Sequence, residues 1–339
     1  MFAQSHDIPA LTRWLKAVMV LVVLMVALGG FTRLSESGLS IVEWKLFSGT
    51  FPPLSAEAWD TEFAAYQQSP EYQQVNQHFG VAEFKKIYWL EYLHRLLGRI
   101  IGLSVILPLA WFWARGMLTP AMKRRGVALA VLVAAQGTVG WVMVASGLVD
   151  QPRVAPVKLA LHLSLAFVFF LALLDTYWRL RPVRQEVVSS AIAWAVKGVF
   201  LLIFLQIILG ALVAGLDAGL SYNTYPLMDG AWVPEGLHRL DPWWKNHLES
   251  VLTVQFQHRM GAVVVVAAAL LLAALSWHQL RHRTPLQWLL ALISLQFLLG
   301  VATLLTHVQM VLAVAHQLLA LALLATCLML VKAYPSRQG

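Results

Sequence analysis

Long apolar stretches alternate with shorter polar segments along the whole chain. A helix needs about 20 apolar residues to cross the hydrocarbon core of a bilayer. Eight stretches meet that need: Trp14–Phe31, Ile87–Trp113, Val127–Val149, Leu159–Trp178, Gly198–Leu216, Val251–Trp277, Leu286–Thr306 and Val308–Val331. They are too long and too uniformly apolar for the strands of a membrane barrel. The pattern therefore predicts an all-α polytopic membrane protein with eight transmembrane helices.

The composition supports a membrane location. Of the 339 residues, 59% are hydrophobic and only 12% are charged, whereas about 25% of a soluble domain is charged. A disordered chain, a nucleic-acid-binding domain and an ordinary cytosolic enzyme are thereby excluded. The net charge of +8 comes from basic residues between the apolar runs, so the predicted partner is a lipid bilayer and no nucleic acid is expected.

Basic residues also orient the predicted spans. If the N-terminus is cytoplasmic, the short inner segments hold the dense clusters Lys123–Arg125 and Arg179–Arg184, as the positive-inside rule requires. Both termini are then cytoplasmic. Met1–Ala10 has no basic region typical of a cleaved leader, so the first span is expected to be retained. The two long outer loops, 34–86 and 217–250, are rich in aromatic residues and are predicted to form ordered caps with short helices.

The two halves of the chain repeat each other. Leu28–Ser40 resembles Leu209–Ser221, and a Gln-x-x-x-Gly pattern occurs in three odd-numbered spans, at Gln136/Gly140, Gln206/Gly210 and Gln296/Gly300. Each half holds an even number of spans and inserts the same way round. We therefore predict two pseudo-symmetric four-helix bundles, residues 1–185 and 186–339. The glycines, Gly29 included, are interpreted as sites of close helix packing.

One histidine stands inside each even-numbered span, at a similar depth in the outer leaflet: His94, His162, His258 and His316. A single buried histidine is more often a packing residue than a ligand. Four that are paired by the repeat favour two bis-histidine sites, His94 with His162 and His258 with His316. Zinc usually has three or four protein ligands, and the only cysteine, Cys327, lies in an apolar run. Haem needs only two axial imidazoles and an apolar slot, so haem is favoured.

Charged neighbours distinguish the two predicted sites. Arg95 and Arg259 follow two of the histidines and suit haem propionates, although snorkelling to the outer interface is an alternative. Glu91 lies three residues before His94, and its counterpart before His258 is Gln255. A carboxylate can move protons and an amide cannot, so the first half is predicted to be reactive. The alternative role of Glu91 is a salt bridge to Arg95 or to Arg99.

At these residues the sequence resembles the haem A synthase family. The resemblance spans the whole chain and rests on these motifs: Gly29–Ser40 (GGFTRLSESGLS), Trp44, Phe51–Pro53, Glu83–Ile87, Glu91–Arg99 (EYLHRLLGR) and Gln255–Arg259 (QFQHR). It is similar to the cysteine-free, mitochondrial and proteobacterial branch, because the outer loops hold no cysteine. A mechanism that uses a loop cysteine is therefore excluded.

The resemblance implies an enzyme that oxidises the C8 methyl of haem O to the formyl group of haem A, for assembly of cytochrome oxidase. His94 and His162 would bracket the substrate haem O, with Glu91 as the catalytic carboxylate. His258 and His316 would hold a haem B cofactor. The expected location is a bacterial inner membrane with the active site on the periplasmic side. An electron donor, a haem O synthase and cytochrome oxidase assembly factors are the expected partners.

Two other functions account for part of the same pattern. A di-haem electron-transfer protein of the cytochrome b type would use the histidines but would leave the Glu91/Gln255 difference without a purpose. A haem exporter or chaperone would bind haem without turnover, and replacement of Glu91 by Gln would then leave the haem products unchanged.

Overall fold

The computed structural model describes residues 8–44, 48–149, 152–280 and 283–336. Within these ranges the chain is helical, with two isolated bridges and no strand. Eight of the helices are long and apolar enough to cross a membrane: α1 (Ile8–Leu34), α4 (Val81–Ala114), α5 (Pro120–Gly147), α6 (Pro156–Leu180), α7 (Ser190–Gly215), α9 (Val251–Ser276), α10 (Thr284–Leu305) and α11 (Met310–Ala333). The predicted all-α, eight-span membrane protein is confirmed. The expectation for Met1–Ala10 falls largely on residues 1–7, outside the described ranges.

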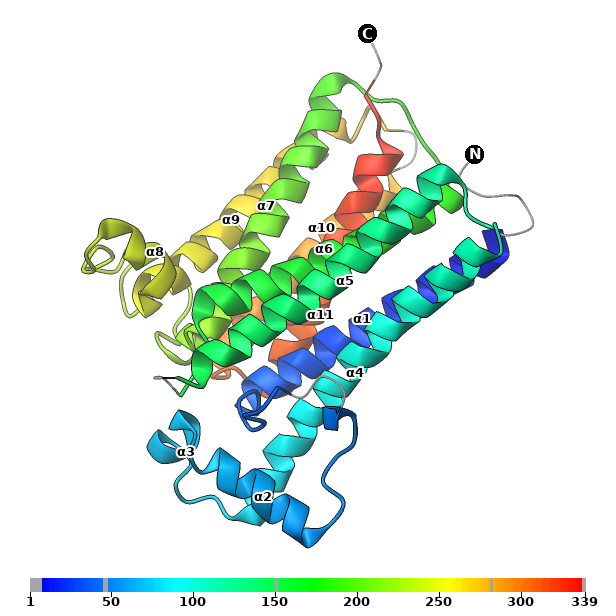
Figure 1. Ribbon diagram of the computed structural model, residues 1–339. Coiled ribbons are helices and arrows are strands. Elements are labelled where there is room, and N and C mark those ends of the chain that lie inside the picture. Colours follow the sequence, from blue (N-terminus) through cyan, green and yellow to red (C-terminus); the bar gives the residue numbers. More distant parts are fainter. Residues whose placement is uncertain (1–7, 45–47, 150–151, 281–282, 337–339) are drawn as a thin grey trace. The chain divides into compact units, whose positions relative to one another are not determined.

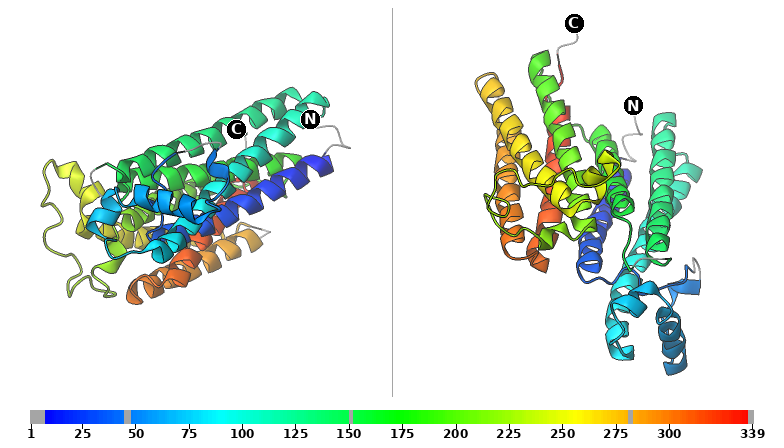
Figure 2. Two further views of the ribbon diagram at one scale, coloured as in Figure 1. Left: turned by 60° about the horizontal axis from the view of Figure 1, so that its bottom comes forward. Right: turned by 90° about the vertical axis from the view of Figure 1, so that its left-hand side faces the viewer.

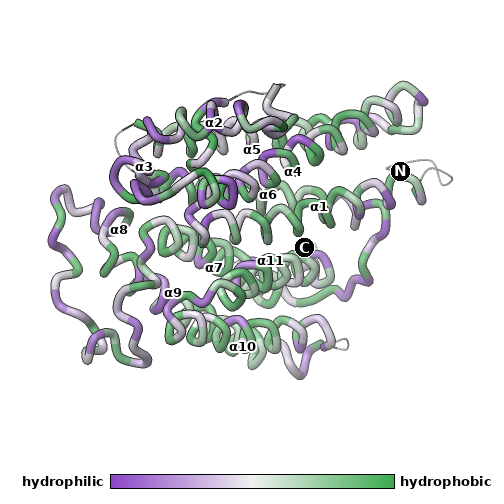
Figure 3. The backbone as a smooth tube through the Cα atoms, turned by 90° about the horizontal axis from the view of Figure 1, so that it is seen from below, coloured by the Kyte–Doolittle hydropathy of each residue, from purple (hydrophilic) through white to green (hydrophobic). Residues whose placement is uncertain are grey.

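Hydropathy follows the helices closely. The helical segments are mainly apolar along their lengths, and polar residues gather in the connecting segments and in α3 (Figure 3). Side-chain oxygens accept bonds from backbone N–H groups at several helix starts, as Thr119 does before α5 and Ser189 before α7. These caps satisfy amides that the first helical turn leaves without a partner.

The start of the last span was predicted two residues too early. His307 and Val308 have φ angles of 52° and 61°, in the left-handed region, and α11 begins only at Met310. The tight reversal from α10 to α11 requires that backbone conformation, which hydropathy alone cannot reveal because Val308 is apolar.

The chain divides into two compact units, Met1–Leu180 and Arg181–Gly339. In the first unit α1 packs against α4 and α6, and α5 packs against the same two helices, so the four close into a ring. Figures 1 and 2 show these helices running alongside one another. Trp14 Nε1 donates to the carbonyl of Ser104 at 2.8 Å, which joins α1 to α4.

The second unit has a ring of the same order. There α7 packs against α9 and α11, and α10 packs against α9 and α11. Thus α7, α9, α10 and α11 take the places that α1, α4, α5 and α6 take in the first unit. The segment before α7 is bonded to the segment after α11: Val188 N donates to the carbonyl of Pro335 at 3.0 Å.

An ordered cap covers one end of the first unit, as predicted for loop 34–86. It contains η1 (Ser48–Thr50), α2 (Ala56–Tyr66) and α3 (Pro70–Gln74). Helix α4 begins at Val81, six residues before the predicted Ile87, and its first turns extend past the end of α1 to carry α2 (Figure 1). The cap has its own apolar core, made of Trp59, Tyr66, Phe84, Ile87, Tyr88 and Tyr92.

The loop 217–250 of the second unit also contains short helices. These are η2 (Ala218–Leu220), η3 (Trp243–Lys245) and α8 (Asn246–Glu249). Asn246 is fully buried, and its amide nitrogen donates to the carbonyls of Leu240 and Trp243 at 2.8 and 2.9 Å. The loop is therefore an ordered structure, as predicted.

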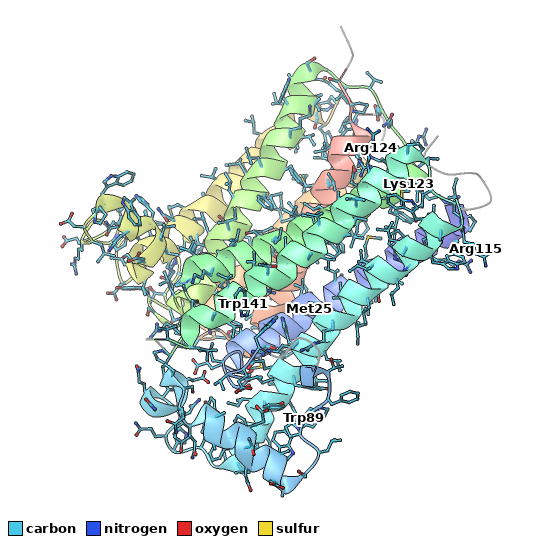
Figure 4. All side chains as sticks on the ribbon, in the orientation of Figure 1. Met25, Trp89, Arg115, Lys123, Arg124 and Trp141 are labelled. Atoms are coloured by element: carbon cyan, nitrogen blue, oxygen red, sulfur yellow. The ribbon has the colours of Figure 1, made fainter. Side chains whose placement is uncertain are left out.

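Basic residues gather at the end of the first unit that is remote from its cap. Arg115, Lys123 and Arg124 lie where α4 turns into α5, and Trp89 lies toward the opposite end (Figure 4). At the same basic end Arg125 forms a salt bridge of 2.6 Å with Asp175, which joins α5 to α6. The two ends of this unit therefore differ in charge.

Candidate functional site

Each of the four predicted histidines faces a glycine on the preceding long helix. A Cβ atom added to that glycine would lie 2.8–3.1 Å from the imidazole Cε1: Gly29 with His94, Gly140 with His162, Gly210 with His258, and Gly300 with His316. Real Cβ atoms are rarely that close to any neighbour. The glycines thus make room for imidazoles, and the simpler interpretation as helix-packing sites was incomplete.

A glutamine one turn before the glycine holds three of these histidines. The side-chain amide of Gln136 donates to the backbone carbonyl of His162 at 3.1 Å and lies 3.3 Å from both ring nitrogens. Gln206 makes the same carbonyl bond to His258 at 2.8 Å and lies 3.0 Å from Nδ1.

Gln296 repeats the arrangement on His316. It donates to the His316 carbonyl at 3.1 Å and lies 3.3 Å from Nε2. Groups bonded to the imidazole of a metal-ligating histidine orient the ring and tune its basicity. These three glutamines were recognised in the sequence only as part of the repeat, and the one-turn spacing to glycine was the available signal for their role.

The histidines come together in two pairs, each within one unit. His94 on α4 lies within electrostatic reach of His162 on α6, and His258 on α9 lies within reach of His316 on α11. All four side chains are only half-buried. Each unit thus presents two imidazoles from two different helices of its ring.

Glu91 is buried at the centre of a polar network beside the first pair. Its Oε2 accepts bonds from Ser40 Oγ at 2.7 Å and from the Ile41 amide at 2.9 Å. Its Oε1 accepts bonds from Arg95 Nη2 at 2.6 Å and Nε at 3.0 Å. The salt bridge considered for Glu91 is therefore present, with Arg95 as its partner.

Arg95 continues the network into the segment that follows α1. Its Nη2 donates to the carbonyl of Ile41 at 2.8 Å and its Nη1 to that of Glu43 at 3.2 Å. Its guanidinium also lies 5.0 Å from the centre of the Trp44 ring, at the range of a cation–π contact. Glu91 and Arg95 together fix the turn of the chain that follows α1, and they thereby join the ESGLS motif and Trp44 to the EYLHR motif.

The second unit repeats this arrangement with opposite hydrogen-bond polarity. Gln255 donates from Nε2 to the carbonyls of Ala218 at 2.9 Å and Ser221 at 2.6 Å. Arg259 donates to the carbonyl of Thr224 at 2.8 Å and also bonds the carbonyl of Tyr222. The glutamine is a donor to its loop, whereas Glu91 accepts from its loop. The first loop thus offers a hydroxyl and an amide donor to Glu91, whereas the second loop offers carbonyl acceptors to Gln255.

The geometry defines a class of protein: a multi-pass helical membrane protein in which each of two four-helix units holds a pair of imidazoles, each facing a glycine of a neighbouring helix. Residues 12–328 match the COX15-CtaA family, described as cytochrome oxidase assembly proteins. The chain belongs to that family.

Curated relatives support the same assignment over nearly the full length. The chain is 45% identical over 344 residues to the Heme A synthase of Bradyrhizobium diazoefficiens. The aligned region covers 99% of this chain and 95% of that protein. It is 46% identical to the Heme A synthase of Bradyrhizobium sp. strain ORS 278, with 92% and 88% covered. With that of Agrobacterium fabrum the identity is 43%, with 95% and 89% covered.

Proposed function

We propose that this chain oxidises the C8 methyl group of haem O to the formyl group of haem A. Family membership and relatives named Heme A synthase over more than nine-tenths of the chain support the reaction. The observation that carries the assignment of residues is the contrast between Glu91 and Gln255, two buried side chains in equivalent places of which only one is an acid.

The residues present suit haem as the bound group. Each unit offers two imidazoles, which is the number that haem iron takes axially. The Nδ1 atoms of His94 and His316 are buried and have no hydrogen-bond partner within the described part of the chain. The described residues contain no group of three or more His, Cys, Asp and Glu side chains that would hold a metal ion. Bound haem would supply the redox chemistry.

In this proposal the first unit holds the substrate. His94 and His162 bracket haem O, and Glu91 is the catalytic carboxylate that accepts or delivers a proton. A buried carboxylate bonded by a hydroxyl, an amide and a guanidinium has a fixed position, so it presents its charge without a reorganisation cost. Gln255 at the equivalent place has no such function, and the second unit would carry electrons.

The second unit would hold haem B as a cofactor between His258 and His316. Arg259 is the proposed propionate ligand there, because its Nε is buried without an acceptor in the described ranges and a guanidinium suits paired carboxylates. Arg95 would act on the propionates of the substrate haem, although Glu91 offsets much of its charge.

The active site would face the outer, periplasmic side of a bacterial inner membrane. Glu91 lies on α4 between Tyr88 and Tyr92 of the cap core, and the basic residues Arg115, Lys123 and Arg124 lie at the other end of the first unit (Figure 4). The positive-inside rule then places both termini in the cytoplasm. Partners of the proposed reaction are an electron donor, a haem O synthase and factors that assemble cytochrome oxidase.

The decisive test is extraction of haem from a host that makes haem O, with and without this chain, followed by mass analysis. The expected result is a formyl haem that forms only when the chain is present. If haem O persists unchanged while the purified protein carries two haems, the chain is an electron-transfer or haem-carrying protein and the proposed reaction is wrong.

Loss of the cofactor can be tested separately from the reaction. His258→Ala and His316→Ala remove the two proposed ligands of haem B. Each is expected to abolish the low-spin optical and paramagnetic resonance signal of that haem in the purified protein. Retention of the signal in both variants would show that haem B, if present, is bound elsewhere.

A further inference from the structure

One of the four histidines lacks the glutamine that holds the other three. The residue one turn before Gly29 is Met25, at the place taken by Gln136, Gln206 and Gln296 before their glycines. Met25 lies on α1, which packs against α4 (Figure 4). Its terminal methyl would be 3.6 Å from a Cβ added to Gly98, one turn after His94. It therefore reaches the helix of His94, as the glutamines reach the helices of their histidines.

The exchange of amide for thioether removes a hydrogen bond. A glutamine amide supplies two donors, whereas a thioether supplies none and accepts only weakly. The Nδ1 atom of His94 is buried and has no partner in the described ranges, while the ring of His258 has Gln206 at 3.0 Å from the same atom. His316 also has an unpartnered Nδ1, but Gln296 reaches its Nε2 and its carbonyl. Within the described ranges His94 is thus the member of the set without a side-chain amide contact.

We infer that Met25 leaves His94 as the loosely held, exchangeable axial ligand of the substrate haem, while the three glutamines fix His162, His258 and His316. This inference rests on the proposed function and deepens it. Partner groups that bond a ligating histidine hold its ring in one orientation, and their removal typically weakens metal binding or activity by 10–100-fold. A haem held by one firm and one weak imidazole has one face that an exogenous ligand can enter.

The inference also distinguishes the two units. A cofactor that only passes electrons gains from two firm ligands, because its coordination then stays the same in both oxidation states. A substrate must be accepted, altered and released, so one weak ligand serves it. The positions follow that division: two glutamines lie in the second unit, and the first unit has one glutamine and one methionine.

Carbon monoxide is the probe that tests this. Purified protein containing its haem is reduced, and CO binding is followed optically in the wild type, Met25→Gln and Met25→Leu. Leucine nearly conserves the volume of methionine and adds no donor. The wild type and Met25→Leu are expected to bind CO at one haem, and Met25→Gln is expected to bind it about 10-fold more weakly or slowly. His94→Ala, with that ligand removed, should bind CO at least as readily as the wild type.

Three outcomes would overturn the inference: a wild type with no CO-reactive haem, equal CO binding in Met25→Gln and Met25→Leu, or equal weakening in both. None of these affects the proposed function, which fails instead if the purified wild type contains no haem. Should Met25→Gln not fold, Gln206→Met makes the reverse change beside His258. It is expected to render a second haem CO-reactive, and haem retention without new CO binding would contradict the inference.

Discussion

Ser40 Oγ donates a 2.7 Å hydrogen bond to Glu91 Oε2, across a sequence separation of 51 residues. Both side chains are almost completely buried. The bond joins the turn after α1 to the helix that carries His94, and the amide of Ile41 adds a second bond to the same oxygen. The acid is therefore part of the structure of the first unit as well as a candidate for its chemistry, and the two roles require separate tests.

Glu91→Gln tests the chemistry while it keeps the shape of the side chain. The amide can still accept bonds from Ser40 and Ile41 through its oxygen, but it loses the bonds from Arg95, carries no charge and takes up no proton at neutral pH. Loss of a general acid or base typically lowers the rate by roughly two to four orders of magnitude. We expect a comparable loss of formyl haem, measured by mass analysis of extracted haem.

Ser40→Ala is the matched control for that variant. It removes one hydrogen bond from Glu91 and leaves the charge and the bond from Ile41. A typical hydrogen bond to a charged group is worth about 1.5–3 kcal/mol, so a lower melting temperature is expected, with haem conversion largely retained. If Glu91→Gln converts haem as well as Ser40→Ala does, Glu91 is structural and its catalytic role is wrong.

Gly140→Ala is expected to disturb the first imidazole pair. The added Cβ would lie 2.8 Å from Cε1 of His162, so the ring must turn or α5 must move away from α6. We expect a loss of haem from the first unit, measured as the haem-to-protein ratio and the low-spin signal of the purified protein.

Gly137→Ala is the control on the same helix. A Cβ there meets nothing within 4 Å, and alanine favours a helix by about 1 kcal/mol over glycine. This variant should therefore bind haem normally and be equally or slightly more stable. Equal haem content in the two variants would show that the close approach of Gly140 to His162 has no bearing on binding.

The eight spans were predictable because hydropathy reports directly on burial in lipid. The helix ends were less so. The first turn of α4, from Val81 to Lys86, is polar enough to be read as loop, yet its Phe84 is fully buried in the cap core. The Gly80 amide donates to Glu83 Oε2 at 3.1 Å, and Phe84 packs against Trp59 and Tyr66 of α2, so both a cap and a tertiary contact stabilise this helical segment. The start of α11 lies two residues after the predicted Val308 for a different reason, because the left-handed Val308 looks like any other apolar residue.

The histidines were predictable because an ionisable side chain inside a span is costly and stands out. Their pairing within a unit followed from the repeat. The role of the glycines did not, because a helix-packing glycine and one that makes room for an imidazole have the same sequence signature. The distinguishing fact is which face of α5 meets His162, and that depends on the rotation of two helices. The Glu91–Ser40 bond likewise joins segments that only the fold brings together.

The orientation of the chain can be tested by labelling single cysteines. Native Cys327 is fully buried and should add little background. Leu54 precedes α2 in the cap and is 86% exposed, and Val187 precedes α7 in the second unit and is 58% exposed. In intact cells an impermeant maleimide is expected to label Leu54→Cys and not Val187→Cys. The reverse pattern would refute cytoplasmic termini and a periplasmic cap.

A buried triad of polar side chains anchors α3 to α2 in the cap. Tyr66 Oη donates to Glu71 Oε2 at 3.0 Å, and Asn76 Nδ2 donates to Tyr66 Oη at 2.9 Å. The pKa of the Glu71 carboxyl is raised from 4.5 to about 7, mainly by burial; the bond from Tyr66 opposes this rise, and the nearby acids Glu91 and Glu36 add to it. The folded cap therefore binds a proton more tightly than the unfolded chain.

The stability of the cap is accordingly expected to fall as pH rises. Because the pKa of Glu71 is about 7 in the folded chain and 4.5 when unfolded, folding favours the protonated form. This contribution to stability is fully present below pH 4.5, is lost as pH rises to about 7, and amounts to about 3 kcal/mol in all. The protection factors of the α2 and α3 amides, which are exchange rates corrected for the intrinsic effect of pH, should thus be lower at pH 8 than at pH 5.5. Glu71→Gln keeps a neutral side chain at this position and should remove the pH dependence of protection. The control Glu57→Gln, at an exposed position of α2, should keep that pH dependence. If Glu71→Gln leaves the pH dependence unchanged, another group is responsible for it.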